Sequence, residues 1–305
     1  MAVREQARRV AFRHERDRRA VEVVAERVVN RVVPQINAKL IGWFERGLDL
    51  GAHIGPEIDR QLTELIQRAM TASHLTGRLR SARTLAVTLR KRRTMAAYDN
   101  ALTFLQRRLA LNPDQMQRLM DHYGNEAARI TRELGYEVER AAQQAITRAI
   151  DRGEHIKEAV ATLREAVAGV GETPPMSPGL VTTLVRTQTQ MAYSAGRWTA
   201  NADAAIQEIL WGYEYATVGD DRVRGEHEGL DGTRLPKDDP RWSEIWTPNG
   251  FQCRCTTVEI MTDEKDLAEV REPPATFVAS DGSEVVPGPD KGWAFNPAEA
   301  LAGVL

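Results

Sequence analysis

Apolar residues recur every three or four positions along the first half of the chain. The earliest such run consists of Val21, Val24, Val28, Val32, Ile36, Leu40 and Trp43. Because an α-helix turns once every ~3.6 residues, this spacing places these side chains on one face of a long helix. Pro34 lies within the run, and a proline inside a helix removes a backbone hydrogen bond and clashes with the preceding turn. We therefore expect a kink or an interruption of the helix there.

The same periodicity predicts further helices after a break at residues 51–56. Apolar positions at helical spacing cover residues 58–69, 85–109 and 116–146. Asn112 precedes Pro113, the order expected of an N-cap and the first helical position. The third helix should therefore reach from Pro113 to about Arg152, and a shorter helix should follow over 156–167. Isolated glycines leave the helix boundaries near them less defined: Gly77, Gly124 and Gly135.

The pattern changes beyond residue 179. Trp211, Tyr213 and Tyr215 alternate with other residues, as is typical of a strand. Asp281-Gly282 is a turn signal between two further short apolar segments. The predicted elements are, in order, a helix at 180–209, strands at 211–217 and 256–261, and a hairpin of 276–279 with 284–286. Long helices followed by this mixed module define an α+β fold.

A Pro- and Gly-rich stretch separates the two patterns. Residues 171–179 contain Pro174, Pro175 and Pro178, which is typical of a linker. We therefore divide the chain into four segments by residue number. These are a helical, elongated and partner-binding region at 1–170, the linker at 171–179, a compact module at 180–297 and a C-terminal tail at 298–305.

Composition narrows the class of protein. The 305 residues carry a net charge of −2, and only 6% of them are aromatic, which favours long solvated helices over a thick core. The N-terminus leads into charged residues without the apolar segment of a signal peptide, and no run approaches the ~18 apolar residues of a membrane helix. The two cysteines do not make a disulfide framework, so we expect folding in a reducing cytosol.

One segment of the helical half is strongly basic. Residues 65–98 contain no Asp or Glu. Among their cationic residues are Arg78, Arg80, Arg83, Arg90, Lys91, Arg92 and Arg93. Such a strip can neutralise DNA phosphates without reading bases, and it can equally be a solvated helix face or one that contacts an acidic protein. Contact with DNA or with a protein partner therefore remains open.

The most informative motifs lie between Trp211 and Ile260. In chain order they are Asp220-Asp221-Arg222-Val223-Arg224-Gly225-Glu226-His227, Leu230-Asp231-Gly232, Asp238-Asp239-Pro240-Arg241-Trp242 and Pro248-Asn249-Gly250-Phe251-Gln252-Cys253-Arg254-Cys255. A second motif follows at Pro289-Asp290-Lys291-Gly292-Trp293-Ala294-Phe295-Asn296-Pro297. Both motifs, in this order, resemble the C-terminal module of phage Mu F-like head morphogenesis proteins, and the segment from Arg186 resembles the preceding helix of that family. The resemblance covers most of 186–297.

His227, Cys253 and Cys255 are the candidate metal ligands, because thiolates and imidazole are the ligands that zinc prefers. A structural zinc site has four ligands, and a carboxylate such as Asp220, Asp221 or Asp231 could supply the fourth. Some members of the family carry a further cysteine where this chain has Arg224. The alternative is that the two cysteines simply lie at the start of a strand. A single structural zinc ion is the one cofactor that the sequence suggests.

Other chemistry at these residues has less support. A disulfide between Cys253 and Cys255 is disfavoured because Cα atoms two residues apart on a strand lie about 6.5–7 Å apart. A nuclease of the His-Asn-His type needs a metal-binding histidine after the asparagine, and no histidine follows His227. No signature of a cysteine enzyme surrounds Cys253. We therefore predict no catalytic residues and keep a metal-dependent nuclease as the alternative.

The remaining motif residues suit a structural network. We expect Arg186 and Arg254 to pair with Asp220, Asp221 or Asp239, because guanidinium groups form well-defined ion pairs with carboxylates. Asn249 precedes Gly250 in a turn signal, and Gly232 ends a similar loop. Trp242 and Trp246 are four residues apart and should form a packing face. The structural candidates are Arg186, Asp220, Asp221, Arg224, Gly232, Asn249 and Arg254.

The resemblance implies a minor head protein of a tailed phage. Such a protein would act in head morphogenesis, near the portal, and would take part in DNA packaging or delivery. It would be made in the bacterial cytoplasm and end in the virion head, with portal, coat or scaffold proteins as partners and with no membrane or small-molecule substrate. A prophage or gene-transfer particle is an equally compatible source.

Overall fold

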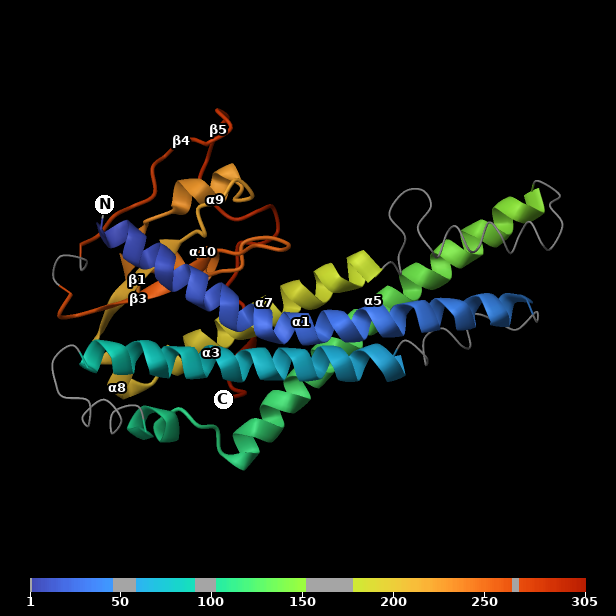
Figure 1. The fold of residues 1–305 in the computed structure, drawn as a ribbon, viewed down its shortest axis with the longest axis horizontal. Helices are drawn as coiled ribbons and strands as arrows, with labels where there is room; N and C mark the ends of the chain where they lie inside the picture. Colours follow the sequence, from blue (N-terminus) through green and yellow to red (C-terminus); the bar gives the residue numbers. More distant parts are fainter. Residues whose placement is uncertain (1, 46–58, 91–102, 152–177, 265–268) are drawn as a thin grey trace. The chain divides into compact units, whose positions relative to one another are not determined.

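The computed structural model describes residues 2–45, 59–90, 103–151, 178–264 and 269–305 (Figure 1). The chain divides into two compact units. Unit 1 comprises residues 1–21, 70–118 and 187–305, and unit 2 comprises 22–69 and 119–186. Unit 1 therefore combines parts of the helical first half with the C-terminal module.

Long helices account for most of the described residues, as the periodicity predicts. They are α1 (Ala2–Glu45), α3 (Glu64–Arg90), α5 (Pro113–Asp151) and α7 (Pro178–Asn201), with a short π-helix η1 at Asp59–Thr63. None of the described helices combines the length and the apolar content needed to cross a membrane. Together with the small sheets of the C-terminal half, these helices confirm the α+β class.

The start of α5 confirms the predicted cap. The Asn112 side chain accepts a hydrogen bond from the Gln115 backbone N–H at 2.8 Å, and the Gln115 side chain accepts one from the Asn112 N–H at 3.1 Å. This reciprocal pair is a capping box, which satisfies two backbone donors that the helix cannot pair internally. Pro113 is the first helical residue, where its missing N–H costs nothing.

Gly77 and Gly124, near which the sequence left helix boundaries undefined, both lie inside helices. Two expectations for the long helices need correction. Pro34 does not interrupt α1, which continues to Glu45. The predicted helix at 180–209 ends at Asn201, because Asp203 caps a separate short helix α8 (Ala204–Gln207) by accepting from the Ala205 N–H at 3.0 Å.

Unit 2 contains an apolar helical core. Its buried residues include Ala25, Val29, Val32, Val33, Ile36, Leu62, Ile66, Leu119, Tyr123, Ala127, Ile130 and Leu134. Val32 and Ile36 of the predicted stripe are buried, whereas Val24 is 61% exposed and the neighbouring Ala25 and Val29 are buried instead. The periodicity therefore identified the helix and part of its buried face, but placed the face around Val24 about one position away.

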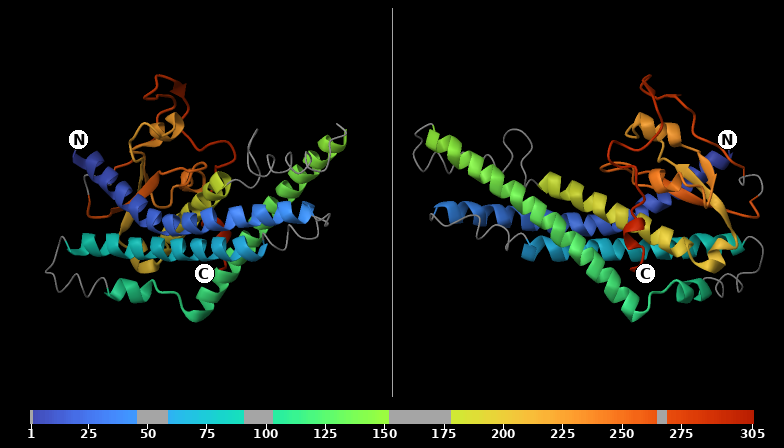
Figure 2. Two further views of the ribbon diagram at one scale, coloured as in Figure 1. Left: turned by 45° about the vertical axis from the view of Figure 1, so that its right-hand side comes forward. Right: turned by 180° about the vertical axis from the view of Figure 1, so that it is seen from behind.

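Unit 1 is built around a three-stranded antiparallel sheet. Its strands are β1 (Leu210–Ala216), β2 (Arg234–Pro236) and β3 (Thr256–Met261), in the order β2-β1-β3. Tyr213 of β1 is paired with Leu235 on one side and with Glu259 on the other. The observed β1 and β3 confirm the two predicted strands. Figures 1 and 2 show β1 beside β3, with the first turns of α1 running past them.

Aromatic side chains fill the core beneath this sheet. Trp242 and Trp246 are buried, their rings lie edge-to-face at 5.9 Å, and Tyr213 contacts both. Trp242 belongs to the short helix α10 (Trp242–Ile245). The predicted packing face of the two tryptophans is therefore confirmed. The same apolar cluster contains Cys253 and Cys255, so the cysteine loop is part of the core.

Helices α3 and α7 approach very closely within unit 1. A Cβ atom on Gly196 would lie 2.0 Å from the His74 carbonyl oxygen, and one on Gly77 would lie 2.1 Å from the Tyr193 carbonyl oxygen. Neither oxygen can move without moving its helix backbone. The two glycines therefore permit a helix crossing that any larger residue would force apart.

The remaining elements follow the motif segments. Helix α9 (Gly225–Leu230) carries His227, and the hairpin of β4 (Phe277–Val278) and β5 (Glu284–Val285) confirms the predicted pairing around Gly282. Near the C-terminus, the 3₁₀ helix η2 (Glu299–Leu301) buries Leu301. The Arg118 side chain donates to the Val304 carbonyl at 2.7 Å, so residues predicted as a tail contact α5 within unit 1.

Several predictions fall on residues outside the described ranges. The break at 51–56, the helix at 156–167, most of the linker at 171–179 and Lys91, Arg92 and Arg93 belong here. Pro178 and Gly179 are described, and they form the first turn of α7 rather than the end of a linker. The predicted domain boundary itself stays a prediction.

Candidate metal centre

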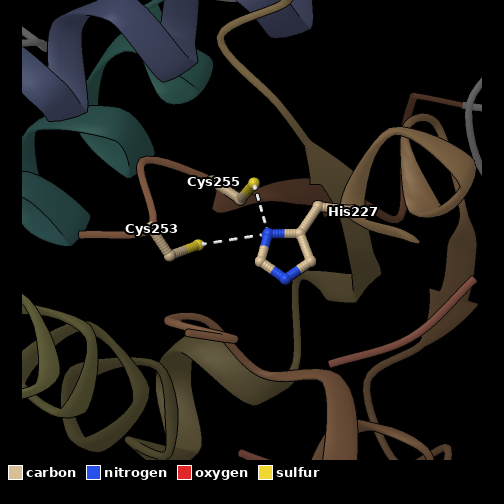
Figure 3. A group of neighbouring side chains, drawn as sticks. All are labelled: His227, Cys253 and Cys255. Atoms are coloured by element: carbon tan, nitrogen blue, oxygen red, sulfur yellow. Dashed lines mark hydrogen bonds between the residues drawn. The ribbon is translucent and has the colours of Figure 1, made fainter. Parts of the chain in front are cut away.

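His227, Cys253 and Cys255 meet inside unit 1. His227 is supplied by α9, and the two cysteines lie on the loop that leads into β3 (Figure 3). All three residues are at least 96% buried. One ligand atom from each lies within 4.8 Å of the other two. The structure therefore brings together three residues that are separated by up to 28 positions in the chain.

The two sulfur atoms converge on the same ring nitrogen. The Cys253 Sγ lies 3.8 Å from His227 Nδ1, and the Cys255 Sγ lies 3.9 Å from the same atom. Figure 3 shows both sulfur atoms on one side of the imidazole, with the second ring nitrogen directed away from them. The site therefore has a sulfur side and a separate outer side.

The outer side of the imidazole faces two oxygen acceptors. His227 Nε2 lies 3.2 Å from the Asn249 carbonyl oxygen and 3.2 Å from Asp290 Oδ1. Asp290 belongs to the second sequence motif, so the two motifs meet at His227. A Cβ atom on Gly250 would lie 2.0 Å from Asp290 Oδ2, which explains why this turn carries a glycine. Arg224 holds the same carboxylate through its Nε at 3.4 Å.

Helices α1 and α7 hold the cysteine loop by its carbonyl groups. Arg18 donates to the Cys253 carbonyl at 3.2 Å and also to the Gln190 side chain. Gln190 donates to the Cys255 carbonyl at 3.4 Å. These three contacts fix the backbone on both sides of Arg254. The loop is therefore positioned by residues far away in sequence, on two different helices.

The turn before the cysteines is fixed from a third direction. Tyr215 of β1 is fully buried, and its hydroxyl donates to the Asn249 side-chain oxygen at 2.8 Å. Gln252 adopts a φ of 55°, which is uncommon for a residue other than glycine, and the Cys253 N–H donates to the Gly250 carbonyl at 3.2 Å. The predicted structural role of Asn249 is consistent with both of its contacts, through its carbonyl and its side chain.

The two thiols differ in their proton affinity. A hydrogen bond from Cys255 and the neighbouring His227 hold the pKa of Cys253 well below its usual value, against the opposing effect of burial. The same hydrogen bond, together with burial, raises the pKa of Cys255 well above its usual value. Burial alone would lower the pKa of His227, but Cys253 and Asp290 outweigh it and raise that pKa. These shifts favour placing a negative charge on Cys253 rather than on Cys255.

The structural motif residues form the predicted network only in part. Arg254 and Asp220 make a two-pronged ion pair at 2.5 and 2.6 Å, as expected. Arg186 pairs instead with Glu26 at 2.6 Å within unit 2, and Asp239 pairs with Arg241. The expectation for Arg186 was wrong because its acidic partner on α1 is 160 residues away in the chain.

The carboxylates considered as a fourth ligand lie elsewhere. Among the described residues, none joins the group formed by His227 and the two cysteines. Asp220 is engaged by Arg254, and Asp231 accepts from the Thr217 backbone and hydroxyl at 2.8 and 3.1 Å. Gly232 follows with a φ of 80°, a conformation that glycine adopts readily, so its structural role is supported.

Two arginines of the basic segment 65–98 form hydrogen bonds and an ion pair inside unit 1. Arg78 donates to the Leu109 carbonyl and to the Thr199 hydroxyl, and Arg80 pairs with Asp17 of α1. Both side chains are half-buried, and burial lowers the pKa of Arg78. Arg83 is exposed, while the side chains of Arg90 and the three following residues are outside the described set. Arg78 and Arg80 therefore hold the fold together rather than forming a free cationic face.

Sequence reasoning missed the residues that position the site. Asp290 was part of a motif, but only the structure places it on His227. Arg18 and Gln190 carry no signal in the sequence, because a buried polar residue interrupts apolar periodicity instead of extending it. For Asp290, the one available signal was the glycine at position 250, where a side chain would collide with the Asp290 carboxylate.

The comparison with known families concerns the same part of the chain. Residues 140–258 match the family described as "Phage Mu protein F like protein". The match confirms the resemblance drawn from the motifs over this segment. The matched segment includes His227, Cys253 and Cys255. The second motif, with Asp290, lies outside it.

Two curated relatives support the assignment. The chain is 29% identical over 153 residues to "Putative capsid assembly protein F" of Escherichia phage Mu, covering 42% of this chain and 34% of that protein. It is 30% identical over 122 residues to "Mu-like prophage FluMu F protein" of Haemophilus influenzae, covering 38% and 29%. The chain thus spans about a third of the length of these relatives. No solved structure matches it significantly.

Proposed function

We propose that this protein acts in head morphogenesis of a tailed phage or prophage, as a minor head protein. The observation that carries the proposal is the Mu F-like segment at 140–258, together with a relative whose name describes capsid assembly. The structure is compatible with a structural role, because the motif residues pack in the core of unit 1 and form ion pairs there. We place the protein near the portal, with coat or scaffold proteins as further partners.

The helices are the part of the chain that we assign to partner binding. Several large apolar side chains of α1 and α5 are exposed, namely Phe12, Val24, Met120 and Tyr136. Isolated exposed apolar residues are common, so they do not define an interface by themselves. Non-specific contact with DNA during packaging or delivery stays a prediction that rests on Arg83, Arg90 and Lys91 to Arg93.

The nuclease alternative is not supported by a specific observation. His227 and both cysteines are buried, so a phosphodiester backbone has no access to them. A cavity of about 610 Å³ lies beside the motif, lined by Asp220, Asp221, Glu228, Asp231 and Glu272 among others. Most of these carboxylates are already engaged by Arg254, Ser280, Thr217 and Arg241, and among the described residues they do not gather into a group that could hold a metal ion.

The test is removal of the gene from the phage or prophage that encodes it. Purified wild-type heads should contain the chain by mass spectrometry, and the deletion should leave few or aberrant heads in electron micrographs. Complementation with the wild-type gene should restore them. Normal infectious particles from the deletion strain, with heads lacking the chain, would overturn the proposal.

Chemical cross-linking of wild-type procapsids then tests the finer assignment. Cross-links from α1 or α5 to the portal protein are expected. Cross-links confined to the coat protein would place the chain away from the portal while leaving its morphogenetic role intact.

A further inference from the structure

We infer that His227, Cys253 and Cys255 bind one zinc ion, through the imidazole Nδ1 and the two sulfur atoms. The inference goes beyond head morphogenesis, because it concerns what holds unit 1 together. Zinc bound to sulfur at ~2.3 Å and to nitrogen at ~2.0–2.1 Å with tetrahedral angles separates the two ligand atoms by about 3.5–3.7 Å. The observed separations of 3.8 and 3.9 Å are close to this value.

The two cysteine sulfur atoms approach the same ring nitrogen of His227. A neutral imidazole nitrogen has one lone pair, which can accept one well-directed hydrogen bond. A protonated nitrogen has one hydrogen to donate. Nδ1 can therefore serve only one of the two sulfur atoms, and without a metal ion the other sulfur depends on the hydrogen bond between the two cysteines. A cation placed between the three atoms satisfies both sulfurs and the nitrogen at once.

The outer side of His227 has the arrangement found in metal-binding histidines. Such a histidine usually donates its second ring N–H to a carboxylate or a backbone carbonyl, which fixes the tautomer and aims the other nitrogen at the metal. His227 Nε2 has one of each, the Asn249 carbonyl and Asp290, at 3.2 Å. Nδ1 is then the atom that faces Cys253 and Cys255.

Charge balance and rigidity also favour the site. Two thiolates neutralise a divalent cation, so the buried group carries no net charge, whereas isolated buried charges are costly. Arg18 and Gln190 hold the carbonyl groups of the two cysteines, so the loop does not have to be reorganised for binding. No fourth His, Cys, Asp or Glu of the described residues joins the group, and the proposal is limited to three protein ligands.

The first test measures metal content and ligand type in the full-length chain. The protein is purified without a polyhistidine tag and without chelators, and its zinc is quantified by elemental analysis. One zinc per chain is expected for the wild type and none for Cys253→Ser/Cys255→Ser. Cobalt(II), substituted for zinc, should show thiolate charge-transfer absorption that weakens in each single Cys→Ser variant.

A second set of variants guards against simple loss of folding. Asp290→Asn should weaken zinc affinity about 10–100-fold while the circular dichroism spectrum stays unchanged, since it keeps the size of the side chain that contacts His227 and Arg224 and removes only its charge. His122→Gln changes a partly exposed histidine on α5 and should bind zinc like the wild type. Zinc affinity is measured by competition with a chromophoric chelator.

Two results would overturn the inference. One is a folded wild type that retains no more zinc than the double cysteine variant and gives no thiolate band with cobalt. The other is a cobalt spectrum that is identical in the wild type and in both single cysteine variants, which would place the metal elsewhere on the chain.

Discussion

Two helix faces in this protein are buried by different chemistry. In unit 2, α1 buries Ala25, Val29 and Ile36, and the surrounding core is apolar. In unit 1, α7 buries Gln190, Arg197 and Asn201, each hydrogen-bonded to a distant strand or loop. The first face is stabilised by non-directional burial, whereas the second works only if each polar group meets its partner.

The difference explains what each region can do. An apolar helix face tolerates exchange of one hydrophobic residue for another of similar volume. A buried polar face instead fixes one geometry, because a missing partner leaves an unpaired group in the core. In unit 1 the polar contacts of α1 and α7 end on the cysteine loop and on β3, so they set the position of the candidate metal centre.

The largest expected effect comes from breaking the buried ion pair of Arg197 and Glu259, whose nearest atoms are 2.6 Å apart. Arg197→Met leaves a buried carboxylate unpaired and should lower the free energy of unfolding by about 3–5 kcal/mol. Adding Glu259→Leu should recover most of that loss. Urea unfolding followed by tryptophan fluorescence measures both.

The matched control for this pair is Arg129→Ala on α5, which removes exposed contacts with Glu126 and Glu133. Surface pairs contribute roughly 0–1 kcal/mol, so its unfolding midpoint should barely move. Equal midpoints for Arg197→Met and Arg129→Ala would contradict the distinction between the two regions.

The next prediction compares a glycine-to-alanine substitution in unit 1 with the same change in unit 2. Gly196→Ala places a methyl group 2.0 Å from the His74 carbonyl, which cannot yield, and should cost about 1–3 kcal/mol. Gly124→Ala meets only the flexible end of Gln67 at 3.0 Å, and better helix propensity should stabilise by up to ~1 kcal/mol. Thermal unfolding should show shifts of opposite sign. Shifts of the same sign would refute the account of the α3–α7 crossing.

A smaller effect should appear as a pH dependence. Burial, and then the charges of Arg197, Arg80 and Arg13, hold the pKa of His14 well below 6.5. Below pH 6.5 the unfolded chain binds a proton that the folded chain excludes. The free energy of unfolding should therefore decrease as the pH is lowered, by up to ~1.4 kcal/mol per pH unit. His14→Gln should flatten that slope between pH 7 and 5 in urea titrations. An unchanged slope would show that His14 is protonated in the folded state.

The smallest effect concerns the cap of α5. Asn112→Ala removes the side-chain acceptor for the Gln115 N–H and should destabilise the helix by about 1 kcal/mol. Hydrogen exchange of the first turn of α5 should accelerate, while exchange in β1 stays as in the wild type. If exchange instead increases in β1 as well, the cap would be part of a wider network.

The sequence predicted elements well wherever a local pattern determines them. The α5 start followed from Asn112-Pro113, and β3 was predicted with its observed bounds. The inner face of α1 was misplaced around Val24 because apolar residues adjoin one another there, as in Val23-Val24 and Val28-Val29, so spacing alone does not choose the face. The sequence left the helix boundaries near Gly77 undefined, whereas in the structure this glycine lets another helix come close.

The sequence predicted the candidate metal ligands but not the residues that hold those ligands in place. His227, Cys253 and Cys255 stood out by residue type and by their motif. Asp290 and Gln190 could not be assigned to it, because their roles depend on contacts across 63 and 65 residues of chain respectively. Such contacts arise from tertiary packing, and a single sequence carries no local trace of them.

The proposed metal ion at His227, Cys253 and Cys255 should stabilise unit 1. The direct measurement is thermal unfolding of the full-length chain by fluorescence of Trp242 and Trp246, which share a core with the cysteines, with zinc and with excess chelator. Chelation should lower the wild-type transition by roughly 5–10 °C and leave Cys253→Ser/Cys255→Ser unchanged. A wild-type transition that is insensitive to both zinc and chelator would contradict the claim.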